Sequence, residues 1–219
     1  MKHRRTLLQV NYCTFPIYPF APQTKFAMKI SIEILREPPF ELAALVRMIN
    51  DVYDVAEDGM WKQKGLRTNE NEIRTLIQEQ RLIVAKLNDH SSSSSGSSSS
   101  SNSNKSIIVG CVKVDRADKN TAGELGMLAV NPSVRGQGIG GKLIAAAEDW
   151  AKNQGYQRMQ LELLTPRDWK NPSKEFNKGW YSRLGYIPQQ KEPFEKDYAD
   201  LVEFLATPCD FTIWKKDLV

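Results

Sequence analysis

Apolar residues recur at every second position in several short stretches of the chain, which is the period of a β-strand. The pattern predicts strands over Met28 to Leu35, Arg81 to Leu87, Ile107 to Asp115, Glu124 to Val130, the segment that contains Met159, Leu161 and Leu163, and Cys209 to Leu218. In the fourth of these strands, strict alternation would place one set of side chains (Leu125, Met127 and Ala129) on one face and another (Gly126, Leu128 and Val130) on the other.

Between these strands, apolar residues recur at the spacing of three and four that is typical of an amphipathic helix. This spacing predicts one helix from Leu42 to Tyr53 and a second through Ile73, Leu76 and Ile77, which Asn69 and Glu72 would cap. It predicts three more helices, marked by Leu143 to Ala151 with Gly155 as C-terminal cap, by Phe176, Trp180 and Leu184, and by residues 192–206.

Composition narrows the class of protein. The chain has 219 residues, of which 41% are hydrophobic, and a formal net charge of +4, which suits one globular domain with appendages. The basic excess is too small and scattered to predict nucleic-acid binding, and no apolar run reaches the ~18 residues of a membrane span. Three cysteines, an odd number without metal-type spacing, favour a reducing compartment. We therefore expect an intracellular protein, cytoplasmic or nuclear. We also expect a monomer or a homodimer.

Two segments lack the pattern of a packed domain. Residues 1–27 are basic and contain three prolines; a mitochondrial presequence, an over-extended gene model and an idle tail all remain open. The run from Ser91 to Ser106 is nearly all serine and has too little apolar surface to offset the entropy of ordering. We predict a domain over 28–219, preceded by a disordered extension and interrupted by a disordered insertion at 89–106, at a hairpin tip.

A glycine-rich turn follows the strand that ends at Val130. Asn131-Pro132-Ser133 interrupts the strand, the turn runs from Arg135 to Gly141, and a helical pattern begins directly after it. A strand, a glycine-rich turn and a helix point unpaired N–H groups and the positive end of a helix at one place, where phosphate usually binds.

Three phosphate-binding motifs compete for this turn. Three glycines formally satisfy the dinucleotide pattern G-x-G-x-x-G, but five residues separate the strand from the first of them. The P-loop pattern fails because Leu143 stands where a magnesium-binding Ser or Thr belongs. The third pattern, Arg/Gln-x-x-Gly-x-Gly/Ala, is met by Arg135, Gly138 and Gly140, and it closely resembles the acetyl-CoA-binding motif of the GNAT superfamily of N-acetyltransferases.

A second motif supports the resemblance. The segment from Trp180 to Tyr186, WYSRLGY, is similar to the family's aromatic-Tyr-x-x-Leu-Gly-aromatic element. The inferred element order, β-α-α-β-β-β-α-β-α-β-β, also resembles the GNAT fold over about 28–219. The resemblance implies an α/β domain of the α+β type, with a mixed, mostly antiparallel sheet flanked by helices.

The resemblance also implies the positions of the cofactor and the catalytic groups. The pyrophosphate of acetyl-CoA would bind the turn amides of Gly136, Gln137, Gly138, Ile139, Gly140 and Gly141, beside Arg135, and the main chain of Leu128, Ala129 and Val130 would pair with the pantetheine. Glu124 falls where some relatives have a general base, and Tyr181 where relatives have the tyrosine that protonates the departing thiolate. Lys174 stands where many relatives have a cofactor-binding asparagine, a role for which Asn177 is the substitute candidate.

The connector between the first two helices carries Asp54, Glu57, Asp58 and Trp61. One interpretation is a solvated turn with one packed tryptophan. The other is an acidic, aromatic lip that attracts a cationic amine as a substrate-binding site.

The predicted function is transfer of acetyl from acetyl-CoA to a primary amine by direct attack. An alkyl ammonium of pKa ~10.4 must lose a proton first, which Glu124, or Glu162 or water in its place, would accept. Only two histidines exist, both in segments expected to be disordered, so neither histidine catalysis nor a metal site is expected. A non-catalytic acyl-CoA-binding module of the same fold is the alternative, and a nicotinamide or flavin enzyme a more distant one. The acceptor itself, a small molecule or a peptide, is open.

Overall fold

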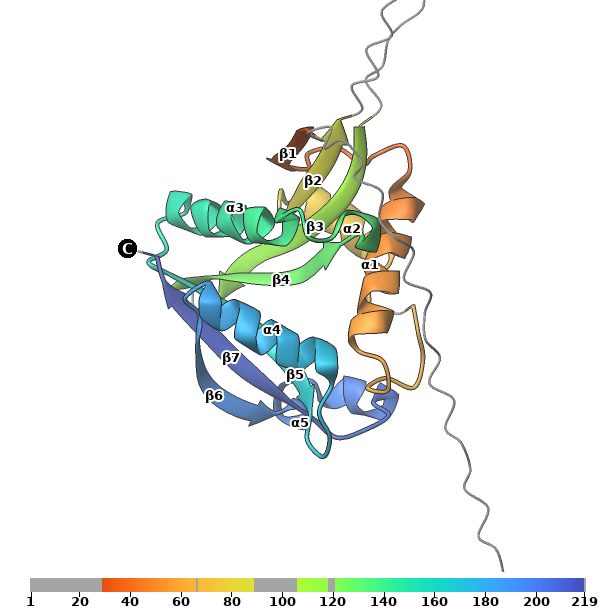
Figure 1. Cartoon of the computed structure of the whole chain (residues 1–219), viewed down its shortest axis with the longest axis vertical. Helices are drawn as coiled ribbons and strands as arrows, with labels where there is room; N and C mark the ends of the chain where they lie inside the picture. The colour runs from red at the N-terminus through yellow and green to blue at the C-terminus, as the bar shows by residue number, and fades with distance from the viewer. Residues whose placement is uncertain (1–28, 66, 89–105, 118–120, 219) are drawn as a thin grey trace, which may run out of the picture.

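The computed structural model describes residues 29–65, 67–88, 106–117 and 121–218 (Figure 1). The strands are β1 (Lys29–Ile34), β2 (Leu82–Asn88), β3 (Ser106–Ala117), β4 (Ala122–Val130), β5 (Arg158–Pro166), β6 (Ile187–Pro193) and β7 (Cys209–Asp217). The helices are α1 (Leu42–Ala56), α2 (Glu70–Gln78), α3 (Ile139–Asn153), α4 (Pro172–Arg183) and α5 (Phe194–Asp197), with 3-10 turns at Pro132–Val134 and Ala199–Phe204. This order confirms the predicted fold class.

The seven strands form one sheet in the order β1-β2-β3-β4-β5-β7-β6. Every neighbouring pair is antiparallel except β4 and β5, which are parallel. Those two strands pair only at Gly123↔Met159 and Glu124↔Gln160, and beyond these residues they separate. The sheet is therefore open between β4, which leads into the glycine turn, and β5, over which α4 lies.

Two apolar layers cover the sheet. On one face α3 packs over β2, β3 and β4, and α4 lies over β5 and β7 (Figure 1). On the other face α1 and α2 bury a second cluster that includes Ile49 and Ile73, each with no exposed surface. This arrangement holds β4 between α1 and α3, at the centre of the molecule.

The strand β4 contains a bulge that the alternating pattern did not predict. Leu125 packs with the α3 cluster, whereas Met127 and Ala129 pack with the α1–α2 cluster, so the prediction that these three share a face is wrong. The register with β3 shifts between Cys111 and Lys113, and Met127 adopts a left-handed φ of 48°. An extra residue on one strand turns the following side chains to the opposite face.

The predicted helix ends are confirmed where a local signal specified them. The Asn69 side chain accepts the Glu72 N–H at 3.0 Å at the start of α2, and Gly155 follows α3 with a φ of 83°. The Glu72 carboxylate instead accepts a hydrogen bond from the Thr68 hydroxyl at 2.8 Å, so the side-chain part of the cap comes from Asn69. The single helix predicted over 192–206 is wrong, because that segment contains the end of β6, the four-residue α5 and a 3-10 turn. Phe194 is buried there, within a cluster that includes Tyr198 and Phe211. Packing of these rings against β7 therefore determines the conformation of the segment instead of one continuous helix.

The predictions for residues 1–27 and for 89–105 lie outside the described residues, and the domain boundaries remain predictions. Ser106, placed in the insertion from the sequence, is the first residue of β3. None of the helices in the described ranges combines the length and the hydrophobicity that a bilayer span requires.

Candidate active site

The separation of β4 from β5 leaves one edge of β4 without a strand partner. From Leu125 to Val130, β4 pairs with β3 on one side but has no β5 partner on the other. Unpaired main-chain groups on a strand edge can receive an extended ligand as an added strand. This is the edge at which Leu128, Ala129 and Val130 are predicted to bind pantetheine.

The glycine turn lies where β4 ends and α3 begins. Gly136 and Gly138 have left-handed φ values of 80° and 73°, which explains glycine at these two positions. The first α3 bond from an amide to a carbonyl runs from Lys142 N–H to Gly138 O at 3.1 Å, so the amides at 139–141 have no carbonyl partner inside the helix. These amides and the helix dipole form a place for an anion.

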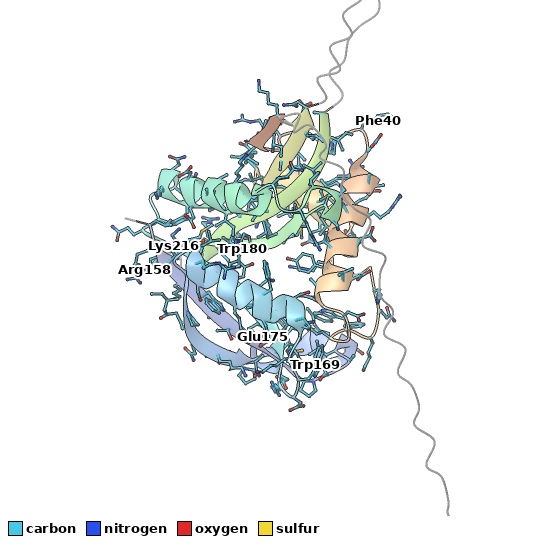
Figure 2. All side chains as sticks on the ribbon, in the orientation of Figure 1. Phe40, Arg158, Trp169, Glu175, Trp180 and Lys216 are labelled. Carbon is cyan, nitrogen blue, oxygen red and sulfur yellow. The ribbon has the colours of Figure 1, made fainter. Side chains whose placement is uncertain are left out.

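Packing supplies a further reason for Gly140. A Cβ at this position would lie 3.0 Å from the ring of Trp180, which extends from α4 into the space beside α3 (Figure 2). By contrast, a Cβ at Gly136, Gly138 or Gly141 would meet nothing within 4 Å. The surface over these three glycines is therefore open, and Arg135 and Lys142 are exposed on the same turn.

A cleft of about 310 Å³ lies between the separated strands. Its walls include Tyr53, Glu57, Trp61, Arg67, Lys113, Glu124, Leu128, Glu162, Lys174, Asn177, Tyr181 and Tyr198. The fold therefore brings Glu124, Leu128, Asn177 and Tyr181 to one cavity, as the predicted site requires. Ala129 and Ile139 are instead buried in the two apolar layers, so only their main chain is available to a ligand.

Tyr181 lies on α4 and borders the cleft. Its side chain is buried, and its hydroxyl makes no hydrogen bond to any residue in the described ranges. Burial raises the pKa of Tyr181 above its ordinary value, and the nearby Tyr53 adds to the effect. The phenol of this cleft residue therefore keeps its proton at neutral pH.

Two carboxylates face the cleft from β4 and β5. Glu124 Oε2 accepts a hydrogen bond from Gln160 Nε2 at 2.9 Å, and Glu162 Oε2 accepts one from the Tyr198 hydroxyl at 2.9 Å. Burial raises the pKa of Glu124; the Gln160 bond opposes the rise, and the Glu162 charge adds to it. A carboxylate with a raised pKa is a better proton acceptor than a solvated one.

The connector after α1 does not form an acidic lip. Glu57 is buried; its Oε1 accepts a 2.6 Å hydrogen bond from Lys174 Nζ, and its Oε2 accepts one of 2.6 Å from Trp61 Nε1. Asp58 is exposed, lies 3.1 Å from Lys64 and does not border the cleft. Trp61 borders the cleft as predicted. The charge of Glu57 is neutralised by Lys174, and Asp58 lies outside the cleft.

Sequence reasoning missed Lys174 as a partner of Glu57, and it missed Tyr198 and Arg67 as cleft residues. Lys174 had one signal, since it replaces the expected asparagine. Tyr198 was assigned to the apolar face of the helix predicted over 192–206, and no recognised motif surrounds Arg67. The described residues contain no group of three or more His, Cys, Asp or Glu side chains that could hold a metal ion.

The family model described as "Acetyltransferase (GNAT) family" matches residues 48–186, more than half of the chain. The chain belongs to the GNAT acetyltransferase family. A search of curated protein sequences gives no match.

Solved structures share the GNAT fold with this chain. N-acetylglutamate synthase from Neisseria gonorrhoeae, complexed with coenzyme A and N-acetyl-glutamate, aligns with a TM-score of 0.54 at 16% identity, over 87% of this chain and 35% of that one. The NatC complex bound to Gag peptide and CoA aligns at 0.56 and 22% identity, over 88% of this chain and 100% of that one. Rv2747 from Mycobacterium tuberculosis, in complex with CoA and NLQ, aligns with a TM-score of 0.50 at 16% identity, over 86% of this chain and 99% of that one. The chain thus spans about a third of the synthase and nearly all of the other two chains.

Proposed function

We propose that this GNAT protein transfers acetyl from acetyl-CoA to a primary amine by direct attack on the thioester. The observation that carries the proposal is that Glu124, Tyr181 and the unpaired edge of β4 at Leu128 border one cleft. A proton acceptor, a proton donor and free main-chain groups are what aminolysis of a thioester needs.

The cofactor binds along the turn and the strand edge. The amides from Gly136 to Gly141 hold the pyrophosphate, with Arg135 beside it. The main chain from Leu128 to Val130 pairs with the pantetheine, and Asn177 borders the same cleft from α4. This arrangement delivers the thioester to the cavity between β4 and α4.

The chain's own groups then move two protons. Glu124 takes a proton from the acceptor ammonium, directly or through water, and the neutral amine attacks the thioester carbon. Backbone N–H groups of the bulged part of β4 stabilise the oxyanion. The C–S bond breaks, and Tyr181 gives its proton to the departing thiolate, whose ordinary pKa is about 8.5. The attacking nitrogen loses its second proton, which returns to Tyr181 directly or through water. The products are an N-acetyl amine and CoA, and no acetyl-enzyme forms.

Labelled acetyl-CoA tests the proposal. The protein is incubated with [¹³C]acetyl-CoA and a pool of amines containing polyamines, amino sugars, amino acids, lysine peptides and protein N-termini. Mass spectrometry should detect a labelled N-acetyl product that disappears when the protein is omitted. Acetyl-CoA binding without any labelled product would contradict catalysis and would favour a non-catalytic acyl-CoA-binding module.

A further inference from the structure

Arg67 is a positively charged group that borders the cleft, and the Glu57 and Glu72 carboxylates act on its charge without forming an ion pair with it. Its guanidinium lies 4.8 Å from the centre of the Tyr53 ring. Among the described residues, no carboxylate forms an ion pair with Arg67, whereas Glu57 and Asp58 each pair with a lysine. Stacking on a ring face leaves the N–H groups at the edge of a guanidinium available for an anion. The connector therefore presents a positive group to the cleft where the sequence suggested a negative one.

Arg67 also borders a second pocket that adjoins the cleft. This pocket has a volume of about 330 Å³, and its apolar lining includes Tyr53, Trp61, Leu201 and Phe204. Leu201 and Phe204 are 42% and 40% exposed, so both side chains are available to a ligand in this pocket. Five residues border both cavities, which therefore adjoin: Tyr53, Glu57, Trp61, Arg67 and Leu201.

Charges of opposite sign border the cleft from different elements of the fold. Glu124 and Glu162 supply negative charge on β4 and β5, and Arg67 supplies positive charge at the connector. The other charged groups that border the cleft are Lys113, which lies 3.9 Å from Asp115, and the Glu57–Lys174 pair. One more carboxylate, Asp54, borders only the second pocket, where its Oδ1 accepts the Gly65 N–H at 2.8 Å. An acceptor that carries an amine and an anion therefore has one preferred orientation.

We propose that the acceptor is a small apolar amino acid whose carboxylate binds Arg67. In that orientation the amino group faces Glu124, and the apolar side chain enters the second pocket beside Leu201 and Phe204. The inference rests on the proposed acetyl transfer and names its substrate class. A guanidinium and a carboxylate form paired hydrogen bonds, which gives the site a means to reject amines that lack the carboxylate.

Matched acceptors and matched variants test the assignment. The acceptors are L-leucine against isoamylamine and L-phenylalanine against phenethylamine, pairs that differ only by the carboxylate. The variants are Arg67→Met, Arg67→Lys and Arg74→Met; Arg74 is an exposed arginine on α2 that pairs with Glu70 at 3.3 Å, away from the cleft. Steady-state acetylation of each acceptor is measured, along with calorimetric binding of each amino acid in the presence of CoA. Thermal melting checks that each variant is folded.

The wild-type protein should prefer the amino acids. Arg67→Met should raise KM for leucine and phenylalanine by about 10- to 100-fold with little change in kcat, and should leave KM for the two amines unchanged. Arg67→Lys should restore part of the affinity, and Arg74→Met should behave as wild type. Equal effects of Arg67→Met on acids and amines, or faster wild-type turnover of the amines, would overturn the carboxylate site while leaving acetyl transfer intact.

The binding measurement separates the two levels of the proposal. Amino acids that bind the wild-type protein and lose affinity in Arg67→Met, without any turnover, would support the carboxylate site and contradict the proposed acetyl transfer. Amino acids that neither bind nor react would overturn the inference whatever the fate of the other amines.

Discussion

Lys174 Nζ lies 2.6 Å from Glu57 Oε1, and both side chains are buried, with 6% and 8% of their surface exposed. This ion pair joins the residue that follows α1 to the first turn of α4 at the border of the cleft. Trp61 Nε1 donates to the second Glu57 oxygen, so both carboxylate oxygens have a partner. The pair therefore links two helices that border the cleft.

Breaking this pair on one side should destabilise the fold. Lys174→Met leaves Glu57 buried without its counter-charge and should lower the free energy of unfolding by about 3–5 kcal/mol. The double variant Glu57→Gln/Lys174→Met removes both charges and should recover most of that loss. Denaturant unfolding measures both values. Lys178→Met, which breaks an exposed pair with Glu175 on the same helix, is the control and should change stability by less than about 1 kcal/mol. A Lys174→Met protein as stable as the control would contradict a structural role for the pair.

Two tyrosines of the WYSRLGY segment should respond in opposite ways to loss of the hydroxyl. Tyr181 borders the cleft and its hydroxyl has no hydrogen-bond partner in the described ranges, whereas the Tyr186 hydroxyl donates to Glu148 at 3.0 Å. Tyr181→Phe should keep stability and acetyl-CoA affinity but lower kcat by about 10²–10⁴-fold if protonation limits the rate. Tyr186→Phe should lose about 1–3 kcal/mol of stability and retain kcat. The reverse result would remove Tyr181 as the acid.

Glu124→Gln should lower activity without lowering stability. Burial raises the pKa of Glu124 from its ordinary 4.5, so the folded chain binds more protons than the unfolded chain just above that value. Stability from this group is therefore full below pH 4.5 and falls as pH rises toward the raised pKa. Glutamine keeps an oxygen for the Gln160 bond and has no charge to bury.

A series of melting curves between pH 4 and pH 8 checks this expectation. The Glu124→Gln protein should gain stability relative to wild type as pH rises, and its residual rate should increase at alkaline pH, where the acceptor is deprotonated in solution. A variant with wild-type rates across the range would leave Glu162 or water as the base.

Pyrophosphate binding at the glycine turn can be tested with a side chain that is compatible with the left-handed backbone conformation of Gly138. Asparagine adopts left-handed φ values more readily than other side chains, so Gly138→Asn adds a side chain with little strain. It should weaken acetyl-CoA binding at least tenfold by calorimetry, because the new atoms occupy the space over the turn amides. Gly155→Asn, at a φ of 83° beyond the far end of α3, adds the same group with open space around its Cβ and should leave affinity unchanged. Equal affinities of the two variants would remove the pyrophosphate from this turn.

Local chemistry made part of the fold predictable. The turn after β4 was specified by Pro132 and by glycines within a few residues, and the cap of α2 by Asn69 and Glu72. Such signals depend only on residues that are close together in the chain, so they can be read from the sequence. The bulge at Met127 depends instead on pairing with β3, which the alternation of β4 does not report.

Charge in the site could not be predicted in the same way. Glu57 and Lys174 are separated by 117 positions, so no local pattern indicates that they neutralise each other. The acidic composition of the connector suggested attraction of a cation, and only the three-dimensional structure shows that Glu57 and Asp58 pair with lysines while Arg67 borders the cleft. Candidate site residues were thus found by motif, and their electrostatic roles required the structure.

Acceptor-dependent release of CoA distinguishes acetyl transfer from cofactor binding alone. Acetyl-CoA is first shown to bind by calorimetry, and the release of free thiol is then followed at saturating acetyl-CoA with and without amine. Acetyl transfer to an amine predicts slow release without amine and a rate that rises to saturation as the amine is added. Tight acetyl-CoA binding with release that no amine accelerates would contradict it.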